Sequence, residues 1–152
     1  MNINIFSYWK FVLIALFIPF MFSCGISNHS SSLPEFHMDV NTSELNFGDY
    51  ISTDVSYYDS SGLLIQKDIT ASIKYRGNAS SRYNKKSFSI KFPGKEKFGD
   101  SDKANHWTLI SEYIDKTFMR HKLSYDLFRS FSEGNYSAHV YYVEVYLNGK
   151  YH

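Results

Sequence analysis

The sequence predicts an α+β domain that is rich in strands and carries one main helix, over about residues 115–133. Three observations support this class. Hydrophobic residues make up 43% of the 152 residues, and 13 Tyr with 13 Phe suit strands that bury a core. Short segments of alternating apolar and polar residues are separated by turn residues. A single stretch has helical spacing instead, which indicates one helix beside the strands.

The first residues have the features of an export signal. Residues 1–10 carry one basic and no acidic side chain, and the uncharged run Phe11–Phe22 follows. This run is shorter than the roughly 20 residues that span a bilayer, but it matches the apolar part of a signal peptide. It leads into Met21-Phe22-Ser23-Cys24, which resembles a bacterial lipobox. The sequence therefore predicts a lipoprotein signal peptide over residues 1–23.

Cleavage before Cys24 would free an amine and a thiol that can both be acylated, so we expect a covalent lipid at Cys24. The chain is then an exported, membrane-anchored lipoprotein of the bacterial cell envelope or surface. The alternative is an uncleaved helical anchor in which Cys24 has no role. Residues 24–34 are polar and Ser-rich and are expected to form a flexible tether, and residues 35–152 are expected to fold.

Short strands are expected along the folded part. Tyr50–Tyr58 alternates imperfectly, and Asp59–Gly62 has the composition of a turn. Pro93-Gly94 is expected to end a later strand. The further predicted strands are Leu63–Gln66, Ile69–Tyr75, Ser87–Phe92 and Trp107–Ile110.

The predicted helix has an apolar stripe. Asp115 is placed to cap its start, and Gly134 fits its end. Lys122 and Asp126 are spaced as an i,i+4 ion pair. We expect the stripe to pack in the core. Its members are Phe118, Met119, Leu123, Leu127, Phe128 and Phe131.

His139–Leu147 has the strongest strand pattern of the chain, and Asn148-Gly149 predicts a hairpin turn directly after it. Only Lys150-Tyr151-His152 follow, which we expect to be too few for a return strand. The sequence therefore predicts a domain that is truncated after a strand and a hairpin turn.

Charge is balanced overall but unevenly distributed. Sixteen basic and fifteen acidic residues give a net charge of +1, which gives no reason to expect a nucleic-acid partner. Residues 24–70 contain seven acidic and one basic side chain, whereas residues 71–103 contain nine basic and three acidic ones. Either the two segments are neighbouring strands that neutralise each other, or the basic segment faces a polyanion such as a nucleotide triphosphate. The single Cys excludes an internal disulfide, and the His residues do not cluster at metal-ligand spacing, so no metal site is predicted.

Three blocks of sequence carry a family resemblance. They are Ile73–Phe92 with its Arg76-Gly77-Asn78 and Lys85-Lys86, Trp107–Arg120 with its Tyr113-Ile114-Asp115-Lys116, and Val143–Tyr151 with its Leu147-Asn148-Gly149. Together they resemble the spore coat protein H (CotH) kinase family over about residues 33–152. The resemblance implies the β-rich lobe of an atypical kinase-like fold. It also implies transfer of phosphate from ATP, with Mg²⁺, to Ser or Thr of secreted or surface proteins.

The first block supplies the candidate nucleotide-binding residues, which are Arg76, Gly77, Asn78, Ser80, Lys85 and Lys86. Phosphoryl transfer needs positive charge and hydrogen-bond donors around the triphosphate. Gly77 would let backbone amides approach an anion, and we expect one of Lys85 and Lys86, but not both, to face phosphate. The alternative is that Gly77 is an ordinary bend and the lysines form a solvated strand start.

Other residues in the blocks have two interpretations. Asp115 either caps the helix or orients Lys116 or Arg120 toward the nucleotide. Trp107 and Tyr113 either pack in the core or stack on adenine. The resemblance places the family's catalytic and metal-binding carboxylates beyond His152, so no catalytic or metal residue is assigned here. It thus implies the N-terminal, nucleotide-facing part of a lipid-anchored kinase, inactive as this fragment.

Two other functions compete with the kinase. One is a noncatalytic surface module that binds protein or glycan, which the 18% aromatic content favours. Exposed coplanar aromatics without a basic cleft would support it. The other is an exported β-rich domain without a site.

Overall fold

A computed structural model describes residues 33–131, 134 and 136–152. The predicted signal peptide, Cys24 and most of the tether lie outside these described residues. No helix in the described part of the chain is long and apolar enough to cross a membrane.

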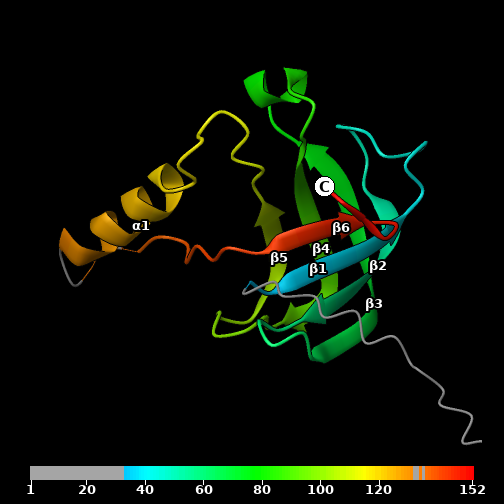
Figure 1. Ribbon diagram of the computed structural model, residues 1–152, viewed down its shortest axis with the longest axis horizontal. Coiled ribbons are helices and arrows are strands. Elements are labelled where there is room, and N and C mark those ends of the chain that lie inside the picture. The colour runs from blue at the N-terminus through cyan, green and yellow to red at the C-terminus, as the bar shows by residue number, and fades with distance from the viewer. Residues whose placement is uncertain (1–32, 132–133, 135) are drawn as a thin grey trace, which may run out of the picture.

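The described residues form one seven-stranded mixed sheet with a single α-helix, which confirms the α+β class (Figure 1). The elements in chain order are β1 (Glu35–Val40), β2 (Ile51–Tyr58), β3 (Leu64–Arg76), the 3₁₀-helix η1 (Ala79–Arg82), β4 (Ser87–Glu96), β5 (Ala104–Leu109), α1 (Arg120–Phe131), β6 (Glu144–Leu147) and β7 (Lys150–Tyr151).

The strand order in the sheet is β5-β4-β3-β2-β1-β6-β7. Neighbouring strands are antiparallel except for β1 and β6, which run parallel with Glu35 opposite Glu144 and Met38 opposite Leu147. This pairing joins the first and last parts of the described chain, and Figure 1 shows β6 lying along β1.

The core lies on one face of the sheet, because alternate strand residues point to the same side. The buried apolar residues of the strands are Phe36, Met38, Val40, Val55, Tyr57, Ala71, Ile73, Phe88, Ile90 and Phe92, and Leu45 and Phe98 join them from loops. The other face, called here the polar face, carries Ser72 and Lys74 of β3 opposite Lys91 and Ser89 of β4.

The turn predicted at Asp59–Gly62 is confirmed. The Gly62 N–H donates to the Asp59 carbonyl at 2.9 Å, and Gly62 has φ of 81°. The two strands predicted after it form the single strand β3, whose register with β2 shifts around Tyr57.

Pro93-Gly94 does not end β4, contrary to expectation. The strand continues to Glu96, and its register with β5 is irregular between Lys91 and Glu96. A proline is tolerated there because the ladder is already interrupted and no N–H is needed from it.

The helix begins later than predicted. The Phe118 N–H donates to the Asp115 carbonyl at 3.0 Å, which closes a turn, and Phe118 has φ of 57°. This left-handed residue cannot be part of an α-helix, so α1 starts at Arg120.

The predicted burial of the apolar stripe is wrong. Every stripe residue is at least 44% exposed, and Phe131 is 74% exposed. Figure 1 shows the reason, since α1 lies to one side of the sheet, linked to it by extended chain, and does not cover the core.

The C-terminal strand is shorter than predicted, and its hairpin is more complete. Only Glu144–Leu147 of the predicted strand forms β6, yet two residues suffice for a return strand, because Tyr151 pairs with Tyr146 and Lys150 with Leu147. The prediction of a turn without a return strand is therefore wrong. The turn itself is confirmed, with φ of 49° at Asn148 and 73° at Gly149.

Asn148 also fixes the hairpin to the sheet. Its side-chain oxygen accepts the Val40 N–H at 2.8 Å, and its side-chain nitrogen donates to the Val40 carbonyl at 2.9 Å. The Asn148 N–H donates to the Met38 carbonyl at 2.9 Å. These bonds continue the β1–β6 ladder past the last residue of β6.

Candidate functional site

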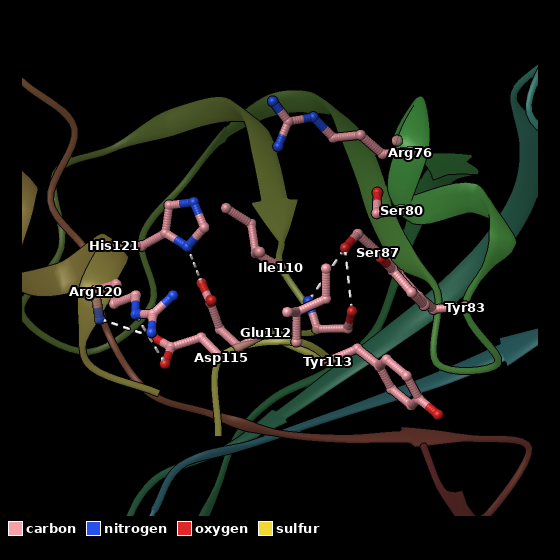
Figure 2. A pocket seen from close by; sticks show the side chains of 13 residues that line it. Arg76, Ser80, Tyr83, Ser87, Ile110, Glu112, Tyr113, Asp115, Arg120 and His121 are labelled. Atoms are coloured by element: carbon pink, nitrogen blue, oxygen red, sulfur yellow. Dashed lines mark hydrogen bonds and ion pairs between the residues drawn. The ribbon is translucent and has the colours of Figure 1, made fainter. Parts of the chain in front are cut away.

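An open cleft of about 540 Å³ lies where β3 ends, β4 begins and the chain leaves β5. This volume lies within the range of about 300–1,000 Å³ typical of ligand pockets. Its lining residues are Arg76, Gly77, Ser80, Tyr83, Ser87, Ile110, Ser111, Glu112, Tyr113, Ile114, Asp115, Arg120 and His121. Figure 2 shows Arg76 and Ser80 on one side of the cleft and Asp115, Arg120 and His121 on the other.

Gly77 begins the loop on the first side. Its φ is 129°, and a Cβ atom placed on it would lie 2.1 Å from the Ser80 Oγ. Only glycine allows this backbone together with so close an approach of the hydroxyl. The next residue, Asn78, closes the turn into η1, because its carbonyl accepts from the Ser81 N–H at 3.2 Å.

Arg76 is the last residue of β3 and is exposed. Among the described residues its guanidinium group makes no ion pair and no side-chain hydrogen bond. No described residue therefore neutralises its positive charge, which is available to an anion in the cleft.

Two serines hold the sides of the cleft together. The Ser111 N–H donates to the Ser87 Oγ at 3.1 Å, and the Ser111 Oγ donates to the Lys85 carbonyl at 3.1 Å. The chain after β5 is thereby fixed against the start of β4.

The far side of the cleft contains two acid–base pairs. Glu112 forms an ion pair with His121, and Asp115 lies 3.5 Å from the Arg120 Nε (Figure 2). The Asp115 carboxylate also accepts from the Thr117 hydroxyl at 2.7 Å and from the Arg120 N–H at 3.0 Å. The hydroxyl of Thr117, followed by the Arg120 N–H, lowers the pKa of Asp115 below its ordinary value, so the carboxylate is ionised.

Two tyrosines complete one wall. The rings of Tyr83 and Tyr113 stack with centroids 5.2 Å apart and planes 23° from parallel. Tyr113 is 38% exposed and lines the cleft, whereas Trp107 packs edge-on against Phe98 and donates its indole N–H to the Ala104 carbonyl. Trp107 therefore packs in the core. The Tyr113 ring is partly exposed in the cleft, as stacking on adenine would require.

The structure brings three of the six predicted nucleotide-binding residues into the cleft, namely Arg76, Gly77 and Ser80. Asn78 is exposed and does not line the cleft. Lys86 donates to the Ser81 carbonyl at 2.6 Å and to the Tyr83 carbonyl, so it braces the loop from within. The Lys85 ammonium group lies over the Tyr151 ring, 5.2 Å from its centroid.

Asp115 combines its two interpretations. It does not occupy the N-cap position, which directly precedes Arg120, yet its carboxylate satisfies the N–H of Arg120, the first helical residue. The same carboxylate lies beside the Arg120 side chain at the edge of the cleft. Asp115 thus both supports the start of α1 and positions a cleft residue.

Several cleft residues were not anticipated from the sequence, chiefly Tyr83, Ser111, Glu112 and His121. Glu112 and His121 are nine positions apart and meet only because the chain turns between β5 and α1. Glu112 has φ of 46°, a left-handed conformation that the local sequence does not predict for a glutamate. The one signal for these residues is their position inside or next to the motif blocks.

The fold and cleft define a class of protein, namely a β-rich domain with an anion-compatible site beside the end of a strand. The CotH kinase protein family matches residues 73–152, which is just over half of the chain and contains every lining residue of the cleft. The chain therefore belongs to the CotH kinase family. No curated protein matches the chain.

Membership in this kinase family implies ATP and Mg²⁺. The cleft fits the nucleotide, because it has the size for one and presents, beside a glycine loop, a guanidinium group that pairs with no described carboxylate. It does not fit the metal. Its carboxylates, Glu112 and Asp115, are each engaged by a neighbouring side chain, His121 and Arg120 respectively, and no group of three or more potential ligands is placed to bind a metal among the described residues.

Proposed function

We propose that this chain is the N-terminal, nucleotide-facing part of an exported, lipid-anchored CotH-like protein kinase. The kinase would transfer phosphate from ATP to Ser or Thr of surface or secreted proteins. The observation that carries this proposal is Arg76, which pairs with no carboxylate of the described residues and lies beside the Gly77–Ser80 loop, in a cleft that the family match covers completely.

The residues on the β3 side would bind the triphosphate. Arg76 supplies positive charge in a geometry suited to phosphate oxygens. The Gly77 backbone and the Ser80 hydroxyl add donors at the same rim. Tyr113, backed by Tyr83, offers an apolar surface for the base.

Bound ATP would supply the phosphoryl group that is transferred. The described residues would bind and orient the nucleotide. Ser87 and Ser111 keep the two walls at a fixed separation, and Asp115 holds Arg120 at the opposite rim. Because the cleft's own carboxylates are engaged, the proposal places the metal-binding carboxylates beyond His152, where the family resemblance implies them.

Calorimetric titration of ATP with Mg²⁺ tests the proposal. Replacing Arg76→Ala removes one charge-assisted contact and should weaken ATP binding by roughly 10- to 100-fold. Arg82→Ala is the matched control, because Arg82 is an exposed arginine of η1 that does not line the cleft, and it should bind ATP like the wild type. Equal affinities for all three proteins would remove the basic loop from the nucleotide site and favour the noncatalytic binding module.

A further inference from the structure

A second cleft shares a wall with the first. It has a volume of about 300 Å³, and its lining includes Lys74 and Ser89 of the polar face of the sheet. Its lining residues are Phe47, Lys74, Tyr75, Arg76, Gly77 and Ser89. Because Arg76 and Gly77 line both clefts, a molecule in the second cleft would lie beside the end of β3 that faces the proposed nucleotide site.

Positive charge gathers in and beside this cleft, because Lys74 and Arg76 line it and Lys91 lies next to Lys74. Lys74 of β3 and Lys91 of β4 both place their ammonium groups over the ring of Tyr50, at 4.8 and 4.3 Å from its centroid. Lys74 donates to the Gly48 carbonyl at 3.0 Å. Among the described residues no carboxylate forms an ion pair with Lys74, Lys91 or Arg76.

The acidic side chains nearby do not change this balance. On the polar face, Asp54 of β2 accepts from the Thr70 hydroxyl at 3.1 Å, farther along the strands. Asp49 precedes Tyr50 in the chain but pairs with neither lysine. Like charges held close together repel, so this arrangement favours an anionic partner.

We propose that this second cleft binds an extended, acidic segment of the protein that accepts the phosphate. This inference rests on the proposed kinase function and adds the substrate class. Lys74 and Arg76 are two residues apart on one strand, roughly 6.6 Å by the rise of a strand, which equals the spacing of alternate side chains in an extended peptide. Carboxylates at alternate positions of the segment would meet them in turn.

The shape and lining of the cleft favour a peptide over a free anion. Lys74 and Arg76 line the cleft two residues apart on β3, and Lys91 lies beside Lys74, since both ammonium groups lie over the Tyr50 ring. Phe47 is 41% exposed and contacts the Tyr75 ring at 5.3 Å, which gives the cleft an apolar wall that an inorganic anion would not use. A peptide would use both the wall and the charges.

Fluorescence anisotropy with labelled peptides tests the inference without nucleotide. One peptide carries Ser with Glu at alternate positions, and the other carries Gln in place of each Glu. The wild type should bind the Glu peptide at least roughly 10-fold more tightly than the Gln peptide. The preference should weaken with added salt, because these charges are solvent-exposed.

Charge-matched variants locate the site. Lys74→Met/Lys91→Met keeps the aliphatic stems over Tyr50 but removes both charges, and it should abolish the preference for Glu. Lys95→Met/Lys103→Met removes two exposed lysines outside the cleft and should retain it. Circular dichroism establishes that both variants are folded. A double variant at 74 and 91 that still prefers Glu would overturn the proposal.

Competition and nucleotide titration separate the remaining outcomes. Displacement of the Glu peptide by inorganic phosphate at equal concentration would show a free-anion site and overturn the proposal. So would Lys74- and Lys91-dependent binding to vesicles of anionic lipid without any peptide preference.

The Lys74→Met/Lys91→Met variant should bind ATP normally, because neither lysine lines the first cleft. If the wild type did not bind ATP but still preferred the Glu peptide, the kinase proposal would be refuted and the peptide site would stand.

Discussion

At the scale of single residues, Gly62 and Gly77 both have positive φ but differ in what surrounds them. Nothing lies within 4 Å of a Cβ atom built on Gly62, whereas one built on Gly77 would meet the Ser80 Oγ at 2.1 Å. A substitution at Gly62 therefore strains only the backbone. A substitution at Gly77 must also displace the hydroxyl that lines the cleft.

We accordingly expect Gly62→Ala to lower the free energy of unfolding by about 1–2 kcal/mol, the usual penalty for a left-handed residue with a side chain. Gly77→Ala should destabilise the protein by more than Gly62→Ala and should also weaken ATP binding. Urea unfolding and calorimetry measure the two effects. Identical losses of stability together with unchanged ATP affinity would show that the approach of Ser80 to Gly77 is unimportant.

Asp115 gives a prediction about pH. Its folded pKa lies below the ordinary value, because the ionised form accepts bonds from Thr117 and Arg120. The ionised carboxylate therefore stabilises the fold above the unfolded pKa of about 3.9, and this contribution fades as the pH falls through the folded pKa.

The variant Asp115→Asn should consequently have a lower Tm than the wild type at neutral pH, and the difference should shrink between roughly pH 5 and pH 2. Asp49→Asn is the control, because Asp49 is exposed and its carboxylate makes no hydrogen bond or ion pair among the described residues. A difference in Tm that stays constant down to the lowest pH would refute the assignment of this stabilisation to the Asp115 carboxylate.

At the scale of elements, α1 departs most from expectation. The recurrence of Met119, Leu123 and Leu127 is typical of a helix that covers a core. In the structure the core is filled by strand residues with Leu45 and Phe98, and α1 lies beside the sheet with these side chains exposed. Periodicity predicts which residues share a face of a helix, but it carries no information on where the helix lies.

The exposed stripe leads to a stability prediction. Leu123→Gln/Leu127→Gln should change the free energy of unfolding by no more than about 0.5 kcal/mol per site, as for other surface substitutions. Ile73→Ala is the contrasting variant, because Ile73 is fully buried, and it should cost about 2–5 kcal/mol. Chemical denaturation measures both. A loss of several kcal/mol in the double glutamine variant would place the stripe in a core.

The hairpin after β6 gives a second prediction at this scale. Asn148→Ala would leave the N–H and carbonyl of Val40 without their partners, which should cost about 1–3 kcal/mol. The Val40 amide should then exchange its hydrogen faster. Asn84→Ala is the control, since Asn84 is exposed and makes no side-chain hydrogen bond among the described residues. Unchanged exchange at Val40 in Asn148→Ala would contradict the role assigned to the Asn148 side chain.

The sequence predicted elements better than their extents and partners. Alternation located β2 and β4, and turn chemistry located Asp59–Gly62 and Asn148-Gly149, because these signals are local. The β1–β6 pairing joins residues about a hundred positions apart, and no local pattern encodes it.

The site residues were likewise predictable only where they lie close together in the sequence. Arg76, Gly77 and Ser80 lie in one motif, whereas Glu112 and His121 become neighbours only through the positive φ at Glu112 and the turn before α1.

At the scale of the whole molecule, the uneven charge is not cancelled by ion pairs. The acidic β1 and β2 do neighbour the basic β3 and β4 in the sheet, as one interpretation of the sequence held. Yet among the described residues no acidic side chain of 33–70 forms an ion pair with a basic side chain of 71–103. The basic charge of this segment is therefore not paired with those carboxylates, and two of its residues line the clefts, Arg76 both of them and Lys74 the second.

The proposed membrane anchor gives a prediction for the whole chain. Acylation at Cys24 would hold the protein on the membrane, since each buried methylene adds about 0.8 kcal/mol. Cys24→Ala, expressed in a bacterial host, should leave the membrane fraction and lose the mass of the lipid. Membrane fractionation and mass spectrometry measure this. A variant that partitions and weighs as the parent does, apart from the substitution, would refute lipidation at Cys24.

The parallel pairing of β1 with β6 also leads us to expect a particular order of folding. Asn148 bonds to a partner 108 residues earlier in the chain, so Glu35–Val40 leave the ribosome long before the strand that covers them. Closing so long a loop is entropically costly, so we expect this pairing to form after the local antiparallel pairs of the sheet. Until then, one edge of β1 offers unpaired N–H and carbonyl groups to any strand it meets. This edge is the point at which a nascent copy is open to pairing with its neighbour, and cover by a chaperone there would protect the growing chain.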